Sequence, residues 1–218
     1  MPGKDKIEIM CEGELLILSA ARAIYWPAQR LLVLADLHLG KTGYFRAHGI
    51  PVSTGVVNDD LERLSGLIRE FRPLQVLVAG DLFHHRYNSE VELFRDWRKE
   101  HETLSFLLVP GNHDRHMNSG HDSLGITMTR ETHQVGPFRF IHEMTEIKSD
   151  CFTISGHLHP GYTISGKARQ SLCLPCFIKS EQHLVLPAFS QFAGMYTGAS
   201  GLPGQTHYVI SERKLFEF

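Results

Sequence analysis

Short apolar segments recur along the chain, and each one stops abruptly at polar residues that can take part in chemistry. The segments are Leu31–Ala35, Val76–Gly80, Phe106–Gly111 and Phe152–Gly156. Continuous apolar runs of this length are typical of strands that are buried on both faces of a sheet. We therefore expect four buried strands at these positions.

A helix is predicted between the first two segments, because apolar residues recur there at alternating spacings of four and three and form one stripe. They are Val57, Leu61, Leu64, Ile68 and Phe71. The helix should end at Arg72, since a residue before proline avoids the α conformation and Pro73 follows.

A second helix is predicted between the second and third segments. Ser89 and Glu92 form a capping-box pattern at its start. Leu93, Phe94 and Trp97 should supply its buried side. Strands that alternate with helices in this way form a parallel sheet with right-handed crossover connections.

Beyond residue 120 the pattern changes to short strands with few helices between them. The expected strands are Phe138–His142, Cys151–Ser155, Ser171–Ile178, His183–Leu186 and His207–Ile210. Gly194–Gly204 contains four glycines and is expected to be a loop. We expect a second sheet packed on the first, with residues 1–218 forming one domain.

Composition is ordinary for a globular protein: 42% of the 218 residues are hydrophobic, 21% are charged, and the net charge is −2. This balance gives no global attraction to nucleic acid or to an anionic membrane. A signal peptide and an apolar stretch of the ~18 residues that span a membrane are not apparent, so we expect a cytoplasmic protein. Plain thiols are favoured over redox or metal use for the Cys173/Cys176 pair, because no second Cys pair completes a zinc site.

The polar residues at the strand ends are types that bind metals. Ligands of open α/β sheets bind beyond the carboxyl ends of the strands, so residues far apart in sequence should gather there. Asp36 and His38 are two apart on an extended chain and point the same way, as do His157 and His159. Asp81 offers a carboxylate that can bridge two cations. Mixed oxygen and imidazole donors suit manganese, iron or zinc.

The order of these motifs resembles that of the calcineurin-like metallophosphoesterase superfamily. Asp-x-His, Gly-Asp, Gly-Asn-His-Asp, a later single His and Gly-His-x-His follow one another between Asp36 and His159. The resemblance implies an α/β fold, a four-layer sandwich of two mixed β-sheets flanked by helices. It also implies a binuclear metal centre.

The same resemblance implies a role for each motif residue. The first metal would be held by Asp36, His38, Asp81 and His159, and the second by Asp81, Asn112, His142 and His157. His113 would assist the leaving group as a general acid, with Asp114 orienting its ring. His142 is preferred over His133 because it ends the expected strand and lies fifteen residues before His157. His84 stands where many members carry an acidic or amide residue.

A narrower resemblance concerns Leu34–Lys41, Gly156–Pro160 and Leu186–Phe189, which are similar to the bacterial ligase-associated DNA damage response phosphoesterases. It implies two Mn²⁺ ions, with Fe or Zn as alternatives, and a DNA endonuclease or phosphodiesterase that acts by metal-activated hydroxide in repair. A DNA helicase, a nuclease and an ATP-dependent ligase would be functional partners. Oligomerisation is left open.

Two other classes of function remain as alternatives. One is a phosphomonoesterase or a phosphodiesterase for small or cyclic nucleotides, and the other is a non-catalytic protein-binding scaffold. The candidates for substrate contact are Lys41, Arg46, His84, Arg86 and Arg115, whose other interpretation is an ordinary polar surface. Tyr44 and Phe45 either stack on bases or pack in the core.

Overall fold

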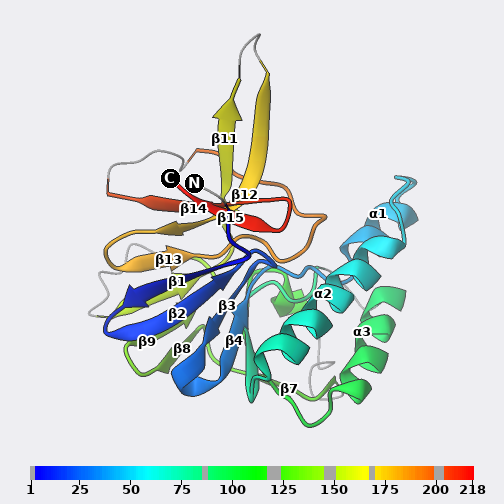
Figure 1. The fold of residues 1–218 in the computed structure, drawn as a ribbon. Coiled ribbons are helices and arrows are strands. Elements are labelled where there is room, and N and C mark those ends of the chain that lie inside the picture. Colours follow the sequence, from blue (N-terminus) through cyan, green and yellow to red (C-terminus); the bar gives the residue numbers. More distant parts are fainter. Residues whose placement is uncertain (1–2, 85–87, 117–123, 145–150, 167–169, 199–203) are drawn as a thin grey trace.

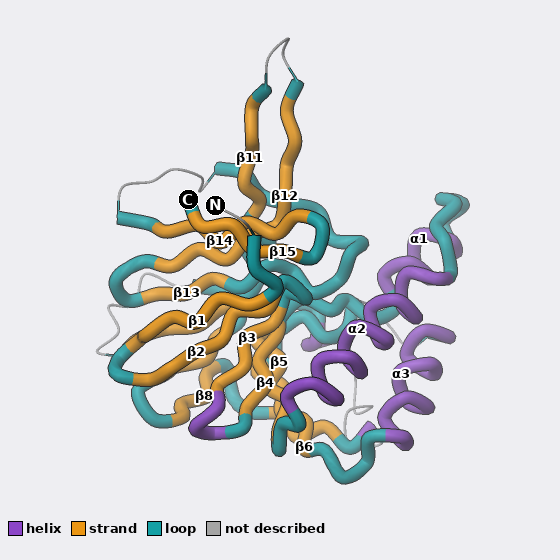
Figure 2. The backbone as a smooth tube through the Cα atoms, in the orientation of Figure 1, coloured by secondary structure: helices purple, strands orange, loops and turns teal. Residues whose placement is uncertain are grey.

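The computed structural model describes residues 3–84, 88–116, 124–144, 151–166, 170–198 and 204–218. Two mixed β-sheets lie face to face, and the α-helices of the described residues cover the outer face of the first sheet (Figure 1; Figure 2). The predicted fold class, α/β with two mixed β-sheets, is confirmed. Of the two helical layers of the expected four-layer sandwich, the described residues show the one on the first sheet.

The first sheet has seven strands in chain order, β1 to β7. Their bounds are β1 Lys6–Cys11, β2 Glu14–Ser19, β3 Ala23–Trp26, β4 Leu31–Leu34, β5 Gln75–Ala79, β6 Ser105–Val109 and β7 Ile126–Met128. Strands β1 to β4 pair antiparallel, and β4 to β7 pair parallel. The predicted strands β4, β5 and β6 are almost entirely buried. Sequence analysis missed the N-terminal strands β1 to β3. Strand β1 alternates buried with exposed positions, whereas β2 and β3 carry continuous apolar runs.

The second sheet runs in the order β15-β14-β12-β13-β10-β9-β8, with β11 paired to β12. Its strands are β8 Thr132–Val135, β9 Phe138–Ile141, β10 Phe152–Ser155, β11 Gly161–Ser165, β12 Ser171–Lys179, β13 His183–Val185, β14 Thr206–Ser211 and β15 Lys214–Glu217. All five expected strands are present within a residue or so at each end. The described parts of the expected glycine loop, residues 194–198 and 204, contain no strand or helix.

The fourth apolar segment, β10, lies in the second sheet as expected, between β9 and β13 and apart from β4, β5 and β6 of the first sheet. Its carboxyl end still reaches theirs, because a Cβ on Gly156 would lie 2.5 Å from Cβ of Ala35 and 2.9 Å from the carbonyl oxygen of Ala79. The candidate site is therefore assembled between two sheets.

The described α-helices are α1 Lys41–Ala47, α2 Gly55–Phe71 and α3 Ser89–Glu100. Helix α2 ends as predicted, with Arg72 in the left-handed conformation at φ 47°. Helix α3 is capped one residue earlier than expected, because the side chain of Asn88 accepts the N–H of Glu90. The buried side of α3 carries Val91, Phe94 and Trp97. Leu93 is 43% exposed, so the expected burial of Leu93 was wrong.

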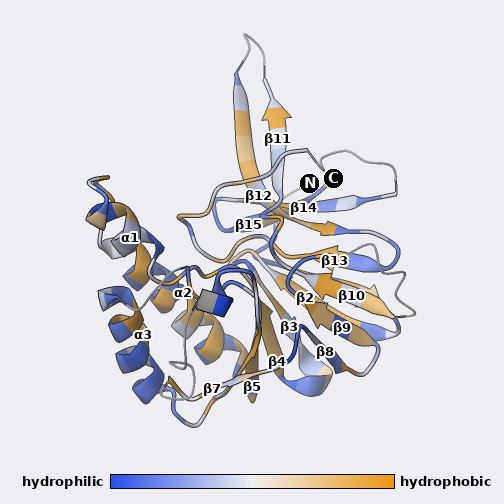
Figure 3. Ribbon diagram, turned by 180° about the vertical axis from the view of Figure 1, so that it is seen from behind, coloured by the Kyte–Doolittle hydropathy of each residue, from blue (hydrophilic) through white to orange (hydrophobic). Residues whose placement is uncertain are grey.

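Aromatic and aliphatic side chains fill the space between the two sheets. Trp26 of the first sheet meets Phe138 of the second edge to face, with ring centroids 4.8 Å apart. A second apolar cluster joins α2 and α3 to the outer face of the first sheet. Figure 3 shows apolar residues along the strands and polar ones on the outer side of the helices. The described helices include none that is long and apolar enough to cross a membrane.

Candidate metal centre

Sharp backbone turns carry the candidate ligands at the strand ends. Asp36, His38, Asp81, His157 and His159 all have positive φ, between 48° and 66°. L-residues other than glycine rarely adopt this conformation, and such strain concentrates at functional sites. The turns are also held by backbone bonds between strand ends, since the N–H groups of Asp36 and His38 donate to the carbonyls of Gly80 and Asp81.

Two glycines let the side chains approach one another closely. A Cβ on Gly80 would lie 2.0 Å from Nδ1 of His142, and a Cβ on Gly111 would lie 2.2 Å from Oδ1 of Asp81. Contacts this short do not occur in proteins, so neither position accepts a side chain in this arrangement. The glycines of Gly-Asp and Gly-Asn-His-Asp therefore make room for the ligands that neighbouring segments supply.

Asp36, His38 and His159 form the first candidate group, with one donor atom from each lying within 4.8 Å of the others. Nε2 of His159 is 3.2 Å from Nε2 of His38 and 3.3 Å from Oδ1 of Asp36. Oδ1 of Asp36 is buried without a hydrogen-bond partner. Burial lowers the pKa of His38 to about 2, so its imidazole is neutral and can offer a lone pair. These donors fit a divalent cation.

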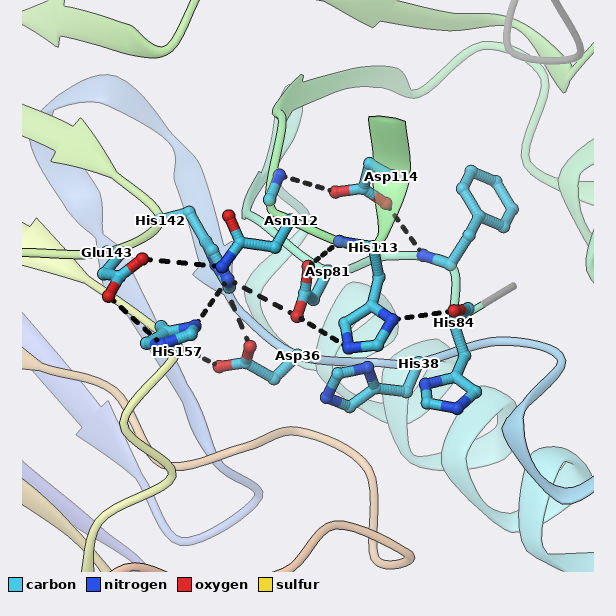
Figure 4. A network of polar contacts seen from close by, with 12 residues as sticks. Asp36, His38, Asp81, His84, Asn112, His113, Asp114, His142, Glu143 and His157 are labelled. Carbon is cyan, nitrogen blue, oxygen red and sulfur yellow. Dashed lines mark hydrogen bonds and ion pairs between the residues drawn. The ribbon is translucent and has the colours of Figure 1, made fainter. Parts of the chain in front are cut away.

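Asp81, His142 and His157 form the second group, again with donor atoms within 4.8 Å of one another (Figure 4). Nε2 of His142 lies 3.4 Å from Oδ2 of Asp81 and 3.0 Å from Nδ1 of His157. Burial opposes a charge on His142, but the hydrogen bond that its ring donates to Asp81 and the charges of Asp36 and Asp81 outweigh this effect and raise its pKa to about 9. A cation placed here would replace that proton.

Asp36 connects the two groups. Its Oδ1 is 3.9 Å from Nδ1 of His142, and its Oδ2 accepts the backbone N–H of His157 at 2.9 Å. Through these contacts the turns that follow β4 and β10 are fastened across the two sheets. The competing histidine of the sequence analysis, His133, lies in β8 and pairs with Phe140, whereas His142 belongs to the second group.

Asn112 lies at the rim of the second group, beside a carboxylate that sequence analysis missed. Its Nδ2 is 3.4 Å from Oε2 of Glu143, whose Oε1 is 3.5 Å from Nε2 of His157. Figure 4 shows Glu143 above the ring of His157. The only signal for Glu143 in the sequence is that it directly follows His142.

The geometry of the centre agrees with comparisons to known proteins. A model of the calcineurin-like phosphoesterase family matches residues 29–176, which is more than half of the chain. The chain belongs to the calcineurin-like phosphoesterase family. It is a metal-dependent phosphoesterase.

Solved structures include one of similar sequence and length. The crystal structure of Pseudomonas putida nuclease MPE is 32% identical, covers 98% of this phosphoesterase and 100% of its own chain, and superposes with a TM-score of 0.83. The phosphoesterase Yfce from E. coli is 12% identical over 84% of this chain and 88% of its own, with a TM-score of 0.39. A search of curated proteins found no match.

His113 of the phosphoesterase points its ring at the centre. Its Nδ1 lies 2.8 Å from the carbonyl oxygen of His84, and because a carbonyl only accepts, Nδ1 carries a proton. Its Nε2 faces inward, 4.0 Å from Oδ2 of Asp81 (Figure 4). The backbone N–H of His113 also donates to Oδ1 of Asp81.

Asp114 does not make the contact expected of it. Its carboxyl group accepts the backbone N–H groups of Phe83 and Gly111, at 2.9 and 2.8 Å, while the acceptor at the ring of His113 is a backbone carbonyl. Burial raises the pKa of Asp114 to about 6, against the effect of these two bonds. Asp114 therefore joins the segment after β5, which contains Phe83, to the segment after β6, which contains Gly111. It orients the ring of His113 only through these two segments.

The candidate substrate residues separate into distinct environments. Lys41 begins α1, where burial lowers the pKa of its ammonium and the charges of Asp36 and Asp81 oppose that shift. Arg46 pairs with buried Glu90 at 2.9 Å. Arg115 pairs with Glu131 at 3.1 Å on the surface. Arg86 lies outside the described residues. The charges that bear on Lys41 are thus those of the centre itself.

His84 joins His38 and His113 in a third set of donor atoms within 4.8 Å. Its ring stacks on that of His113, with centroids 4.6 Å apart and planes at 26°. A histidine at this position therefore contacts both a candidate ligand and the candidate acid. The four cysteines form no disulfide, and burial raises the pKa of Cys176 to about 12.

Proposed function

We propose that the phosphoesterase hydrolyses phosphodiester bonds with two divalent cations held between the two sheets. Residues of the first group would hold one cation and residues of the second group the other, with Asn112 completing the second set. The observation that carries this proposal is the pair of donor groups, drawn from turns of both sheets and joined by contacts of Asp36. We propose Asp81 as a shared ligand, and Asp36 lies close enough to both groups to assist.

The donor chemistry supports manganese, with iron or zinc as alternatives. Each group mixes carboxylate oxygen with imidazole nitrogen, and these donors suit such ions better than magnesium or calcium. When bound, two such cations would neutralise charge on the phosphoryl oxygens and make a water molecule acidic enough to attack at neutral pH. The chain's own contribution is to keep His38 neutral and to leave Oδ1 of Asp36 without a competing hydrogen bond.

His113 is proposed as the proton donor to the departing oxygen. The carbonyl of His84 fixes its ring through Nδ1, so Nε2 is the atom that can hand a proton to a group bound at the centre. To act as the acid, the ring must carry a proton on both nitrogens, and its Nε2 lies 4.0 Å from Oδ2 of Asp81. Hydrolysis by this arrangement needs no covalent enzyme intermediate.

Nucleic acid is the proposed substrate, and DNA with single-stranded character in particular. Support comes from the Pseudomonas putida nuclease MPE, which is 32% identical over nearly the whole chain. A role in repair with a helicase, a nuclease and a ligase stays a prediction, as does a cytoplasmic location. The net charge of −2 means that contacts to the phosphate backbone must be local.

An activity panel with Mn²⁺ tests the proposal. We expect hydrolysis of bis-p-nitrophenyl phosphate and of single-stranded DNA, with slower reaction of double-stranded DNA and of a p-nitrophenyl monoester. Rising salt should weaken DNA cleavage steeply while the small diester responds mildly. A preference for the monoester would support the rival phosphomonoesterase. Bound metal without any hydrolysis would support the scaffold.

A further inference from the structure

A row of aromatic rings leads from the proposed proton donor out onto helix α1. The ring of His113 stacks on that of His84. The ring of His84 meets Tyr44 at a centroid distance of 5.8 Å and an angle of 71°, and Tyr44 meets His48 at 4.2 Å and 38°. Tyr44 is partly exposed and His48 is exposed. The row thus extends from the metal centre to solvent.

The position of His113 indicates which part of the substrate lies beside this row of rings. A general acid must lie beside the oxygen that departs. The nucleoside attached to that oxygen therefore leaves the centre on the side of His113. Beyond His113, the rings of His84 and then Tyr44 are the next aromatic surfaces of the row.

Helix α1 is held firmly enough to present a ring in a fixed place. Glu90 is buried and accepts the N–H of Gly40 at 2.9 Å, the hydroxyl of Thr42, and the guanidinium of Arg46 at 2.9 Å. The side-chain amide of Asn88 donates to the carbonyl of Gly40. A platform fixed before binding loses little entropy when a base stacks on it.

The neighbouring aromatic residue has a different use. The ring of Phe45 meets that of Phe192 edge to face at 5.6 Å, which ties α1 to the segment following Ser190. Phe45 therefore packs within the protein. Of the two interpretations that the sequence left open, core packing therefore applies to Phe45.

We propose that Tyr44 is the stacking platform for the base of the leaving-side nucleotide. This inference rests on the proposed nuclease function and on His113 as the acid. Stacking on an aromatic side chain tolerates any base, because every base has a π face, so the platform would position single-stranded DNA without reading its sequence. Double-stranded DNA, whose bases are already stacked, would gain nothing from it.

The test uses a DNA strand in which one linkage is a normal phosphodiester and the others are uncleavable methylphosphonates. The product that ends in a free hydroxyl identifies the leaving side. An abasic residue on that side should lower kcat/KM of the wild-type protein by roughly 5- to 100-fold, the range expected for loss of one base–aromatic stack. An abasic residue on the other side should matter less.

Two substitutions complete the experiment. Tyr44→Leu keeps bulk but removes the ring, and should lower kcat/KM on the intact strand by the same factor while losing sensitivity to the leaving-side abasic residue. Tyr44→Phe keeps the ring and should behave as the wild type. Tyr196→Ala is the control, because Tyr196 is an exposed tyrosine outside the row of rings, and its backbone N–H donates to the carbonyl of His159. This variant should remain sensitive to the abasic residue on the leaving side.

A second readout needs no variant. With a strand whose central linkage is also an uncleavable methylphosphonate, the fluorescence of 2-aminopurine should be quenched on binding of Mn²⁺-loaded wild-type protein when the label is on the leaving side, and less on the other side. Equal quenching on both sides, or full abasic sensitivity in Tyr44→Leu, would overturn the proposal. Hydrolysis of bis-p-nitrophenyl phosphate without any cleavage of DNA would instead remove the proposed substrate, and this inference with it.

Discussion

His142 and Asp81 illustrate how far single residues can be assigned from the sequence. Their residue types and their positions after apolar runs indicate that they are candidate ligands. The structure places Nε2 of His142 3.4 Å from Oδ2 of Asp81. The partners of His113 and Asp114 could not be assigned in this way. These contacts use backbone groups of His84, Phe83 and Gly111, and depend on how two loops meet in space.

Replacing His113 tests the proposed proton donor. We expect His113→Ala to retain bound metal and to cleave DNA on the order of 10²-fold more slowly, because the departing alkoxide then lacks an acid. Hydrolysis of bis-p-nitrophenyl phosphate should fall less, since p-nitrophenolate departs without protonation. Equal losses on both substrates would contradict the role. The matched control is His133→Ala on β8, which should keep full activity on each.

The pH dependence of metal binding tests the second group. The pKa of His142 is about 9 in the metal-free protein, so below that pH its ring carries a proton that a cation must displace. Affinity for Mn²⁺ should therefore rise with pH, by about tenfold per unit for one proton between pH 6 and 9. Calorimetry in buffers of different ionisation enthalpy measures the proton release. An affinity that falls as pH rises would contradict this assignment.

At the scale of elements, helix α2 and the segment after β13 hold the backbone of Asp36, a residue of the first group, in place. Arg63 of α2 pairs with buried Asp60 at 2.7 Å and donates to the carbonyl of Phe189. The N–H groups of Phe189 and Ser190 in turn donate to the carbonyls of Ala35 and Asp36. The helix was predicted from its apolar stripe. Its polar link to Asp36 was not, because it joins residues more than a hundred positions apart.

Removing this link should affect both stability and the centre. Arg63→Ala leaves Asp60 buried without its cation, which costs about 3–5 kcal/mol in the free energy of unfolding. Denaturant titration measures that cost, and metal affinity should fall as Asp36 loses its support. Arg69→Ala, an exposed arginine on the same helix, is the control. Unchanged stability of Arg63→Ala would show that the link is not required.

Strand β10 was predicted with its burial, its bounds and its place in the second sheet. Its pairing with β9 and β13 was not, because an apolar run does not show which strands lie beside it. Strands β1, β8 and β15 escaped prediction because exposed positions interrupt their apolar pattern. Strands β2 and β3 escaped it although their apolar runs are continuous.

For the whole molecule, the two sheets share one buried cluster, which includes Trp26, Phe138, Phe140 and Phe177. We therefore propose that residues 1–218 form one domain and unfold in one cooperative step. Near-ultraviolet and far-ultraviolet circular dichroism should give coincident thermal transitions for the metal-free protein. Two separate transitions would show that the sheets are independent units.

Crystallography of the protein with Mn²⁺, using anomalous scattering at the manganese edge, tests the binuclear centre most directly. We predict two anomalous peaks, one among Asp36, His38 and His159 and the other among Asp81, His142 and His157, and the loss of both in Asp81→Asn. The exposed substitution Asp96→Asn should keep both peaks. A single peak, or manganese bound elsewhere in the wild-type protein, would contradict the account.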